Sequence, residues 1–297
     1  MRDTSVIGSG TGGTVSGIGR KFKEISPNTT IVGVDPIGSV MALPENLNKT
    51  DITFYEVEGI GYDFIPTVLD RSVIDEWIKT DDEDSLRMAR RLIREEGYLI
   101  GMSSGAAMVA ALKAAKDLKE GQNVVVILPD SIRNYITKFI TDQWMEARSF
   151  KPCVNTNNYW WWDNNVSTLD MGKLQTTTPT TKCERVLHIM KKFGVDQIPV
   201  VDSNGGIIGM VTLQNIMSKL ISENIQSSEN VEKIMTRIYP KLYKSANLGL
   251  ASRVLEKEPY VVILEKEGTG TSQVEKPIGI LSAIDVLQYI SKEQTES

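Results

Sequence analysis

The sequence predicts a parallel α/β layer followed by a smaller module that is built from a tandem repeat. Strand-like and helix-like segments alternate over residues 1–148, the pattern of a parallel sheet with helical crossovers. The run from Asn123 to Leu128 is mostly Val, Ile and Leu, as expected of a strand covered on both faces. Towards the C-terminus, residues 208–216 align with residues 278–286 at a constant offset of 70.

Each element of the first part has a local signal. A short apolar run at Val6 and Ile7 predicts the first strand, and helix formers continue from the glycine-rich loop after it to about Glu24. Residues 82–96 place apolar side chains on one face of a helix that Gly97 ends. We further predict strands over residues 30–35, 98–101 and 123–128, a long loop over residues 36–71, a helix that ends near Lys119 and a helix over residues 134–145.

The second part is predicted to begin with a linker over residues 149–172. Its Tyr159-Trp160-Trp161-Trp162 run should dock on a neighbouring surface; stacking on nucleic-acid bases is the alternative. The two repeat copies then span residues 173–226 and 227–293. Each copy has a helix, a strand, a turn or loop, a second strand and a closing helix, with a tight hairpin at Ser203–Gly206 in the first copy and a polar loop over residues 267–276 in the second.

Composition limits the class of protein. A chain of 297 residues with 41% hydrophobic and 24% charged residues is typical of a globular protein of about two domains. The net charge of −5 and the lack of a long basic block argue against a nucleic-acid partner. No apolar run reaches the ~18 residues that cross a bilayer, and no secretory signal is present. Because Cys153 and Cys183 form no C-x-x-C pair and His188 has no ligand partner at metal-binding spacing, we expect a cytoplasmic protein without a metal site.

The first candidate site is the loop Gly8-Ser9-Gly10-Thr11-Gly12-Gly13-Thr14. Dense glycines let the backbone gather several N–H groups at the start of a helix, an arrangement that favours a phosphate. The Gly8-x-Gly10-x-x-Gly13 spacing, with Asp35 ending the next strand, also fits a dinucleotide, and thus an NAD-type oxidoreductase domain joined to a ligand-sensing module. The hydroxyls of Thr11 and Thr14 instead favour a phosphate monoester, and a tight turn with no ligand is the third interpretation.

A second candidate stretch is Gly101-Met102-Ser103-Ser104-Gly105. We expect it at the C-terminal end of a strand, where the ligands of open α/β sheets lie. A serine here could meet the far side of a ring whose phosphate rests on the first loop. The alternative is that Ser103 and Ser104 only cap the following helix.

Three stretches, in this order, closely resemble the cystathionine β-synthase family: residues 10–14, 57–66 and 126–135. That family belongs to the pyridoxal-phosphate (PLP) enzymes of fold type II, the fold of the tryptophan-synthase β-subunit. The tryptophan linker and the tandem repeat resemble its regulatory half, a pair of CBS domains, so that the resemblance covers about residues 4–292. It implies a PLP-dependent lyase that joins L-serine and L-homocysteine to L-cystathionine, in transsulfuration and cysteine biosynthesis.

The resemblance also implies residue roles and a homodimer. The PLP phosphate would be bound by Gly10, Thr11, Gly12, Gly13 and Thr14. Ser103 would meet the pyridine nitrogen, and as a neutral group it would leave the ring a modest electron sink. Gly59 and Tyr62 would lie on a mobile loop over the substrate; the alternative for Tyr62 is that its ring only packs.

The same resemblance predicts an incomplete PLP domain. The lysine that forms the family's Schiff base lies upstream of the phosphate loop, and none of the nine residues before Gly10 is a lysine. The heme-ligating segment of animal members is also absent. Without that lysine, no Schiff base forms and no general base takes the Cα proton, so we expect a truncated chain that is inactive alone.

In the repeat module, Ser282 and Asp285 end a strand and open a helix, where a hydroxyl and a carboxylate can bind the two hydroxyls of a ribose. The first copy has Thr212 with Asn215, a weaker ribose acceptor. The resemblance thus favours one allosteric adenosyl site with S-adenosylmethionine as its ligand, formed by Val195, Asp196, Gln197, Ile198, Ser282 and Asp285. The alternatives are that Ser282 only caps a helix, or that the whole chain is a non-catalytic adenosyl-nucleotide-binding protein.

Overall fold

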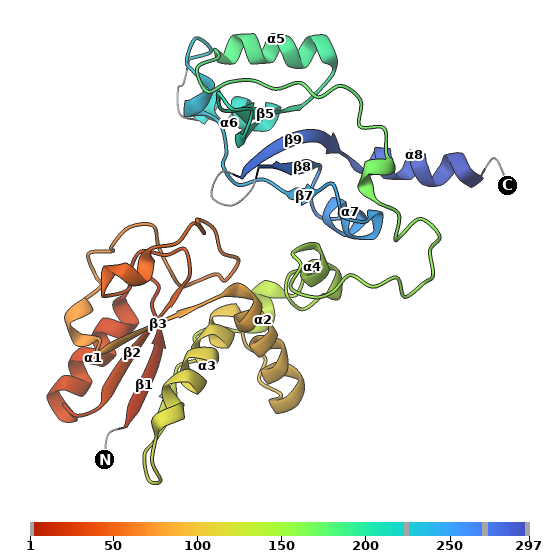
Figure 1. Ribbon diagram of the computed structural model, residues 1–297. Coiled ribbons are helices and arrows are strands. Elements are labelled where there is room, and N and C mark those ends of the chain that lie inside the picture. Colours follow the sequence, from red (N-terminus) through yellow and green to blue (C-terminus); the bar gives the residue numbers. More distant parts are fainter. Residues whose placement is uncertain (1–2, 223–225, 269–272, 295–297) are drawn as a thin grey trace. The chain divides into compact units, whose positions relative to one another are not determined.

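The computed structural model of the chain describes residues 3–222, 226–268 and 273–294 (Figure 1). It consists of two compact units, Met1–Met145 and Glu146–Ser297, each of which has its own core. No helix within these described stretches is long and apolar enough to cross a membrane. The same stretches contain no group of three or more His, Cys, Asp or Glu side chains that could hold a metal ion.

The first unit is a four-stranded parallel sheet in the order β3-β2-β1-β4. Helix α1 lies on one side of this sheet, and α2 and α3 lie on the other (Figure 1). The strands are β1 (Thr4–Gly8), β2 (Thr30–Pro36), β3 (Glu76–Thr80) and β4 (Val124–Val126), and the helices are α1 (Gly13–Ile25), α2 (Asp82–Arg91) and α3 (Met102–Ala114). Helix α4 (Asp142–Ala147) spans the boundary between the first and second units.

The central strands are apolar because both of their faces are covered. Ile7 and Ile31 pack with Val15 of α1 in one buried cluster, which also contains Trp77 of β3. On the other side, α2 and α3 approach closely at Gly105, where a Cβ atom would run into the carbonyl oxygen of Ser85. The alanine-rich sequence of α3 therefore serves close helix packing rather than an amphipathic surface.

Several predicted elements of the first unit need correction. Residues 98–101 form only an isolated bridge from Ile100 to Ser131, because Tyr98 and Leu99 are exposed and give a strand no buried face. Strand β4 is an edge strand with Val125 half exposed, so it is not covered on both faces as predicted. The predicted helix over residues 134–145 is a 3-10 turn at Ile132–Tyr135 followed by turns and α4. Strand β3, which follows a 3-10 turn at Arg71–Val73, has no counterpart among the predicted strands.

The predicted helix over residues 82–96 is confirmed, with one change. Helix α2 passes into a π-helical turn at Leu92–Glu96, and Gly97, with φ of 73°, ends it. The side chain of Asp81 caps the helix by accepting a hydrogen bond of 2.8 Å from the N–H of Asp84.

The second unit contains two small sheets. One is the antiparallel pair β5-β6, and the other has the order β7-β8-β9, with β7 and β8 parallel and β8 and β9 antiparallel. Met210 of β6 shares a buried cluster with Tyr260, Val262 and Leu264, so the two repeat copies pack on each other. The strands are β5 (Gln197–Val201), β6 (Ile207–Thr212), β7 (Lys241–Tyr243), β8 (Val261–Glu267) and β9 (Val274–Leu281), and the helices are α5 (Cys183–Phe193), α6 (Leu213–Ser222), α7 (Leu248–Leu255) and α8 (Ala283–Gln294).

The first hairpin is confirmed, and the second differs from its prediction. The carboxylate of Asp202 accepts hydrogen bonds of 2.8 Å from the N–H groups of Asn204 and Gly206, which fixes the tight turn. The ends of the predicted polar loop over residues 267–276 belong to strands, because β8 extends to Glu267 and pairs there with Val274, the first residue of β9. Residues 269–272 of that loop lie outside the described residues. Ion pairs such as that of Lys276 with Glu267 explain why polar residues form this part of the ladder.

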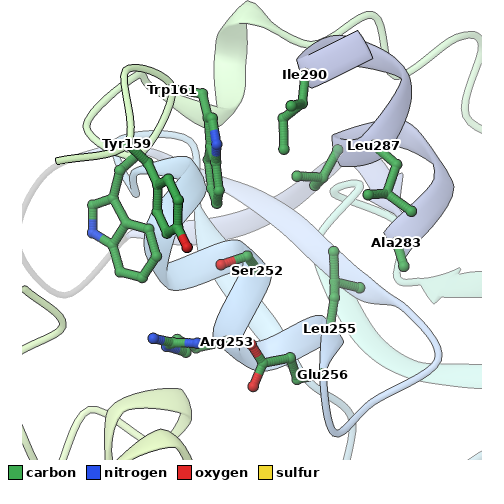
Figure 2. Close-up of a pocket in the computed structure, with 11 residues that line it drawn as sticks. Tyr159, Trp161, Ser252, Arg253, Leu255, Glu256, Ala283, Leu287 and Ile290 are labelled. Atoms are coloured by element: carbon green, nitrogen blue, oxygen red, sulfur yellow. Dashed lines mark hydrogen bonds and ion pairs between the residues drawn. The ribbon is translucent and has the colours of Figure 1, made fainter. Parts of the chain in front are cut away.

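The linker aromatics dock within the second unit. Figure 2 shows Tyr159 and Trp161 facing α7 and α8 across a cavity of about 420 Å³. Tyr159 stacks on Trp161 with ring centroids 5.5 Å apart. Trp162 is 3% exposed, its ring covers Gly249 of α7, and the Arg253 guanidinium lies 5.0 Å from its centroid. These contacts favour the docking interpretation over base stacking.

Replacing Trp162 with alanine should lower the stability of the second unit by about 3–5 kcal/mol, because a large buried ring is lost and the backbone around Gly249 cannot collapse onto the space. Hydrogen exchange of the α7 amides in the whole chain measures this loss. The control is Trp160→Ala, since the Trp160 side chain is 46% exposed. Equal effects of the two substitutions would contradict the assignment of Trp162 as the anchor.

Candidate cofactor and ligand sites

The loop over residues 8–14 has the geometry of an anion site. It leaves the carboxyl end of the central strand β1 and leads into α1, whose N-cap is Gly12 with φ of 92°. The N–H of Ser16 bonds to the carbonyl of Gly12, but the N–H groups of residues 10–15 have no acceptor in the described chain. Thr11 and Thr14 are exposed beside them. Unpaired donors at a helix N-terminus favour a negatively charged group.

The second predicted stretch, residues 57–66, lies against this loop. The N–H of Gly61 donates a hydrogen bond of 2.8 Å to the carbonyl of Ser9. A Cβ atom on Gly10 would lie 2.5 Å from the carbonyl oxygen of Gly59, so only glycine permits this approach. Gly59 itself has φ of 86° and is exposed. The structure thus brings the predicted phosphate loop and the predicted substrate loop together.

Two interactions hold residues 57–66 in place. At their start, the Asp82 carboxylate accepts hydrogen bonds of 2.7 and 3.0 Å from the N–H groups of Glu56 and Val57. Burial raises the pKa of this carboxyl group, against the opposing effect of the two N–H donors. Further along, the buried Ser39 hydroxyl bonds to both the N–H and the carbonyl of Tyr62 at 3.0 Å.

The Tyr62 ring makes packing contacts. It lies against the core cluster beside α1 and meets Phe64 edge-on, with ring centroids 5.1 Å apart. These contacts account for its position without a chemical role, and its catalytic assignment stays a prediction.

Asp35 is unsuited to the ribose role that a dinucleotide site requires. Its side chain is fully buried and forms an ion pair of 2.7 Å with Lys79, whose side chain is 10% exposed. The Lys79 ammonium also donates to the carbonyl of Ser39 and to the Asn48 side chain. A ribose would have to displace this network, so the geometry disfavours the NAD-type interpretation.

The serines of residues 101–105 do not cap their helix. The N-cap of α3 is Gly101, and no side chain bonds to it there. Ser103 is 2% exposed and its hydroxyl lies 3.3 Å from Asp130 Oδ1, whereas the buried Ser104 hydroxyl has no partner among the described residues. The capping interpretation is therefore wrong for both serines.

Asp130 is a residue of this site for which the sequence suggested no role. It follows β4, which runs parallel to β1, so Asp130 and the glycine loop leave the sheet at the same edge. Its backbone carbonyl accepts a hydrogen bond of 3.2 Å from the N–H of Gly101, which joins residues 126–135 to the start of α3. The Pro129-Asp130-Ser131 motif in residues 126–135 was the sequence signal that could have pointed to Asp130. A motif alone, however, does not reveal which side chains the Asp130 carboxylate contacts.

The predicted adenosyl residues lie around two adjoining cavities in the second unit. Asp196, Gln197 and Ser282 line a cavity of about 520 Å³ between the repeat copies. Val195, Gln197, Ser282 and Asp285 line a smaller one of about 140 Å³. Ile198 lines neither of these two cavities, because its side chain is fully buried in the core of the first copy.

Ser282 and Asp285 do contact each other at the start of α8. Asp285 Oδ2 accepts hydrogen bonds from the N–H of Ser282 at 2.7 Å and from its hydroxyl at 2.6 Å. In the first copy, Thr212 donates to the Asn215 side chain at 2.9 Å. Each pair thus stabilises the first turn of a helix. The Asp285 carboxylate and the Asn215 side-chain amide are half-buried, and each keeps lone pairs that can accept a further hydrogen bond.

Comparison with known proteins finds a family match within each of the two units. Residues 1–130 match the family described as pyridoxal-phosphate dependent enzyme, and residues 166–222 match the CBS domain. Cystathionine beta-synthase of Apis mellifera is 49% identical over 99% of this chain and 58% of its own length. The enzymes of that name from Rattus norvegicus and Dictyostelium discoideum are 43% and 42% identical over 99% of this chain, which spans 56% and 59% of their lengths.

The chain therefore covers little more than half the length of these relatives. Its α/β sheet, the PLP-type first unit and the CBS domain in the second unit agree with the fold that the sequence predicted. Residues 1–130 are thus similar to the pyridoxal-phosphate-dependent enzyme family, and the chain as a whole is similar to cystathionine β-synthases.

Proposed function

We propose that the first unit binds PLP and is the corresponding part of a PLP-dependent lyase that joins L-serine to L-homocysteine. The observation that carries the proposal is the group of unpaired N–H donors over residues 10–15, closed on one side by Gly59. The resemblance to cystathionine β-synthases over 99% of the chain supports the reaction class.

The residues present fit PLP. The Gly59 carbonyl approaches the glycine loop closely because Gly10 carries no side chain, and Thr11 and Thr14 add exposed hydroxyls. The buried hydroxyls of Ser9 and Ser104 lack partners in the described chain, as is expected near an absent polar group. Bound PLP supplies an electron sink for the carbanion that forms when the substrate Cα proton leaves.

In this proposal each residue of the chain has a limited task. Residues 10–14 orient the cofactor by its phosphate, and Ser103 contacts the pyridine nitrogen. Gly59 lets the loop over residues 57–66 approach the substrate, and Tyr62 lies on that loop. The homodimer stays a prediction of the resemblance, as do the boundaries of the linker and of the second CBS domain.

We further propose that PLP binds to this chain without a covalent bond. Two lysines of the first unit are engaged in ion pairs: Lys79 with buried Asp35, and Lys138 with Glu58. We expect PLP added to the pure chain to give no Schiff-base absorbance band and to remain removable by dialysis after borohydride treatment. A band that borohydride abolishes, with PLP retained on a mapped lysine peptide, would contradict this. Free PLP mixed with an amine is the positive control.

We propose that the second unit binds an adenosyl ligand, with S-adenosylmethionine as the first choice. The 520 Å³ cavity is within the usual size range of small-molecule sites. Asp285 offers a carboxylate oxygen to ribose hydroxyls, and Asp196 and Gln197 offer polar groups nearby. Two adjoining cavities that share Gln197 and Ser282 support a single extended site.

Asp285→Asn should weaken S-adenosylmethionine binding by about tenfold or more, because a charge-assisted hydrogen bond to the ribose becomes a neutral one. Isothermal calorimetry on the whole chain measures the change. Asn215→Ala is the matched control in the first copy, and we expect it to leave the affinity unchanged. If neither the unaltered chain nor the control gives heat with S-adenosylmethionine, the adenosyl proposal fails.

A further inference from the structure

The turn that follows β2 holds the backbone of Tyr62 through one buried side chain. The Ser39 hydroxyl donates a hydrogen bond of 3.0 Å to the Tyr62 carbonyl and accepts one of 3.0 Å from the Tyr62 N–H. The N–H of Val40 donates to the same carbonyl at 2.9 Å. A hydroxyl can donate once and accept twice, so Ser39 serves both polar groups of the Tyr62 backbone. Because Ser39 is fully buried, solvent does not compete for these bonds.

This turn is itself fixed by the Lys79 ammonium of β3. The ammonium donates hydrogen bonds of 2.7 Å to Asp35 Oδ2, 2.8 Å to the Ser39 carbonyl and 3.2 Å to Asn48 Oδ1. An ammonium has three N–H donors, and all three are used here. One of them ends on the backbone of the residue whose side chain holds Tyr62. The buried ion pair therefore fixes the residue that carries the hydroxyl.

Residues 59–62 connect this turn to the glycine loop. The N–H of Gly61 donates a hydrogen bond of 2.8 Å to the Ser9 carbonyl. A Cβ atom on Gly61 would lie 2.5 Å from Pro36 Cγ, so the segment also packs directly on the end of β2. Its first residue, Gly59, brings its carbonyl against the glycine loop. The segment that Ser39 holds is therefore the one that borders the candidate anion site.

We infer that Ser39 is a positioning residue for the cofactor site, which prearranges residues 59–62 beside the N–H donors of the glycine loop. The inference rests on the proposed function, in which these donors bind the PLP phosphate. Ser39 acts through the Tyr62 backbone. A segment that is already held in its bound arrangement favours binding, whereas the need to order a loose segment weakens it.

Hydrogen exchange of single amides, in the whole chain without PLP, tests the hold on Tyr62. In Ser39→Ala the Tyr62 amide should exchange faster by about tenfold or more, because its N–H loses a buried acceptor. The Val57 amide is the internal reference. Its acceptor is the Asp82 carboxylate, which the substitution leaves in place, so its exchange should not change.

Ser16→Ala is the matched control, because the buried Ser16 hydroxyl makes the same two kinds of bond elsewhere. It accepts from the Asp70 N–H at 2.8 Å and donates to the Val68 carbonyl at 3.0 Å. The control should therefore speed the exchange of the Asp70 amide and leave that of the Tyr62 amide unchanged.

Saturating PLP then separates a role at the cofactor site from a purely local one. In Ser39→Ala, bound PLP should slow the exchange of the Tyr62 amide, because binding now has to order the segment. In the unaltered chain this amide is already protected, so PLP should change its exchange less. Equilibrium dialysis should show that Ser39→Ala binds PLP about three- to tenfold more weakly than the unaltered chain.

The outcomes are distinguishable. PLP that fails to bind to the unaltered chain overturns the proposed function, and the role of Ser39 towards the cofactor falls with it. If PLP binds, three results overturn the inference alone: a Tyr62 amide that exchanges equally in the unaltered chain and in Ser39→Ala, an equal increase at Tyr62 in Ser16→Ala, and a PLP affinity that Ser39→Ala leaves unchanged.

Discussion

Gly10→Ala should lower the affinity of the chain for PLP by at least about tenfold, or roughly 1.4 kcal/mol. The added methyl group would lie 2.5 Å from the carbonyl oxygen of Gly59, a distance that no Cβ atom tolerates. Because the opposing atom is backbone, the loop over residues 57–66 or the glycine loop must move, and the N–H donors over residues 10–15 are displaced. Equilibrium dialysis with PLP measures the affinity.

Gly17→Ala is the matched control, since Gly17 lies in α1 and nothing is within 4 Å of the position of its Cβ atom. Alanine favours a helix interior over glycine by about 0.5–1 kcal/mol, so this variant should be slightly more stable and bind PLP as before. If Gly10→Ala binds PLP as well as Gly17→Ala does, the glycine loop is not the phosphate site.

Lys79→Met should destabilise the first unit by about 3–5 kcal/mol, because it leaves the Asp35 carboxylate buried without its partner. Asp35 is fully buried and the Lys79 side chain is 10% exposed, so water cannot replace the lost ammonium. Hydrogen exchange of the backbone amides of β2, the strand that contains Asp35, measures this loss of stability in the intact chain.

Two further variants separate the ion pair from a general effect of methionine. Lys21→Met removes the exposed pair with Glu24 and should change little, because water already screens that pair. Lys79→Met combined with Asp35→Asn removes the stranded charge and should recover much of the lost stability. An undiminished protection of β2 in Lys79→Met alone would refute the buried-pair account.

The periodic elements of the fold could be predicted from the sequence, and the edges of the sheets could not. The helix from Asp82 has a capping residue, an apolar face and a terminal glycine, and all three appear in the structure. Strand β3 has one exposed, two half-buried and two buried positions, in an order that shows no clear alternation. Its place beside β2 depends on pairing with residues distant in sequence, which local patterns do not encode.

The candidate sites show the same division between local features, which the sequence predicts, and long-range contacts, which it does not. The glycine loop and its helix are local, and their spacing alone predicted an anion site. The approach of Gly59 to Gly10, the burial of Asp35 with Lys79 and the contact of Ser103 with Asp130 are long-range. The two carboxylates show how much this matters. Its position in the sequence made Asp35 a candidate ribose ligand in the alternative NAD-type interpretation, and its buried ion pair with Lys79 disfavours that role.

Competition binding tests the central claim most directly. The chain is incubated with phosphorus-labelled PLP, and inorganic phosphate or NAD is added while bound PLP is counted. We predict that PLP binds, that inorganic phosphate displaces it because both occupy residues 10–14, and that NAD does not. PLP that fails to bind, or NAD that displaces it at lower concentration than phosphate, would contradict the assignment of this loop to a phosphate monoester.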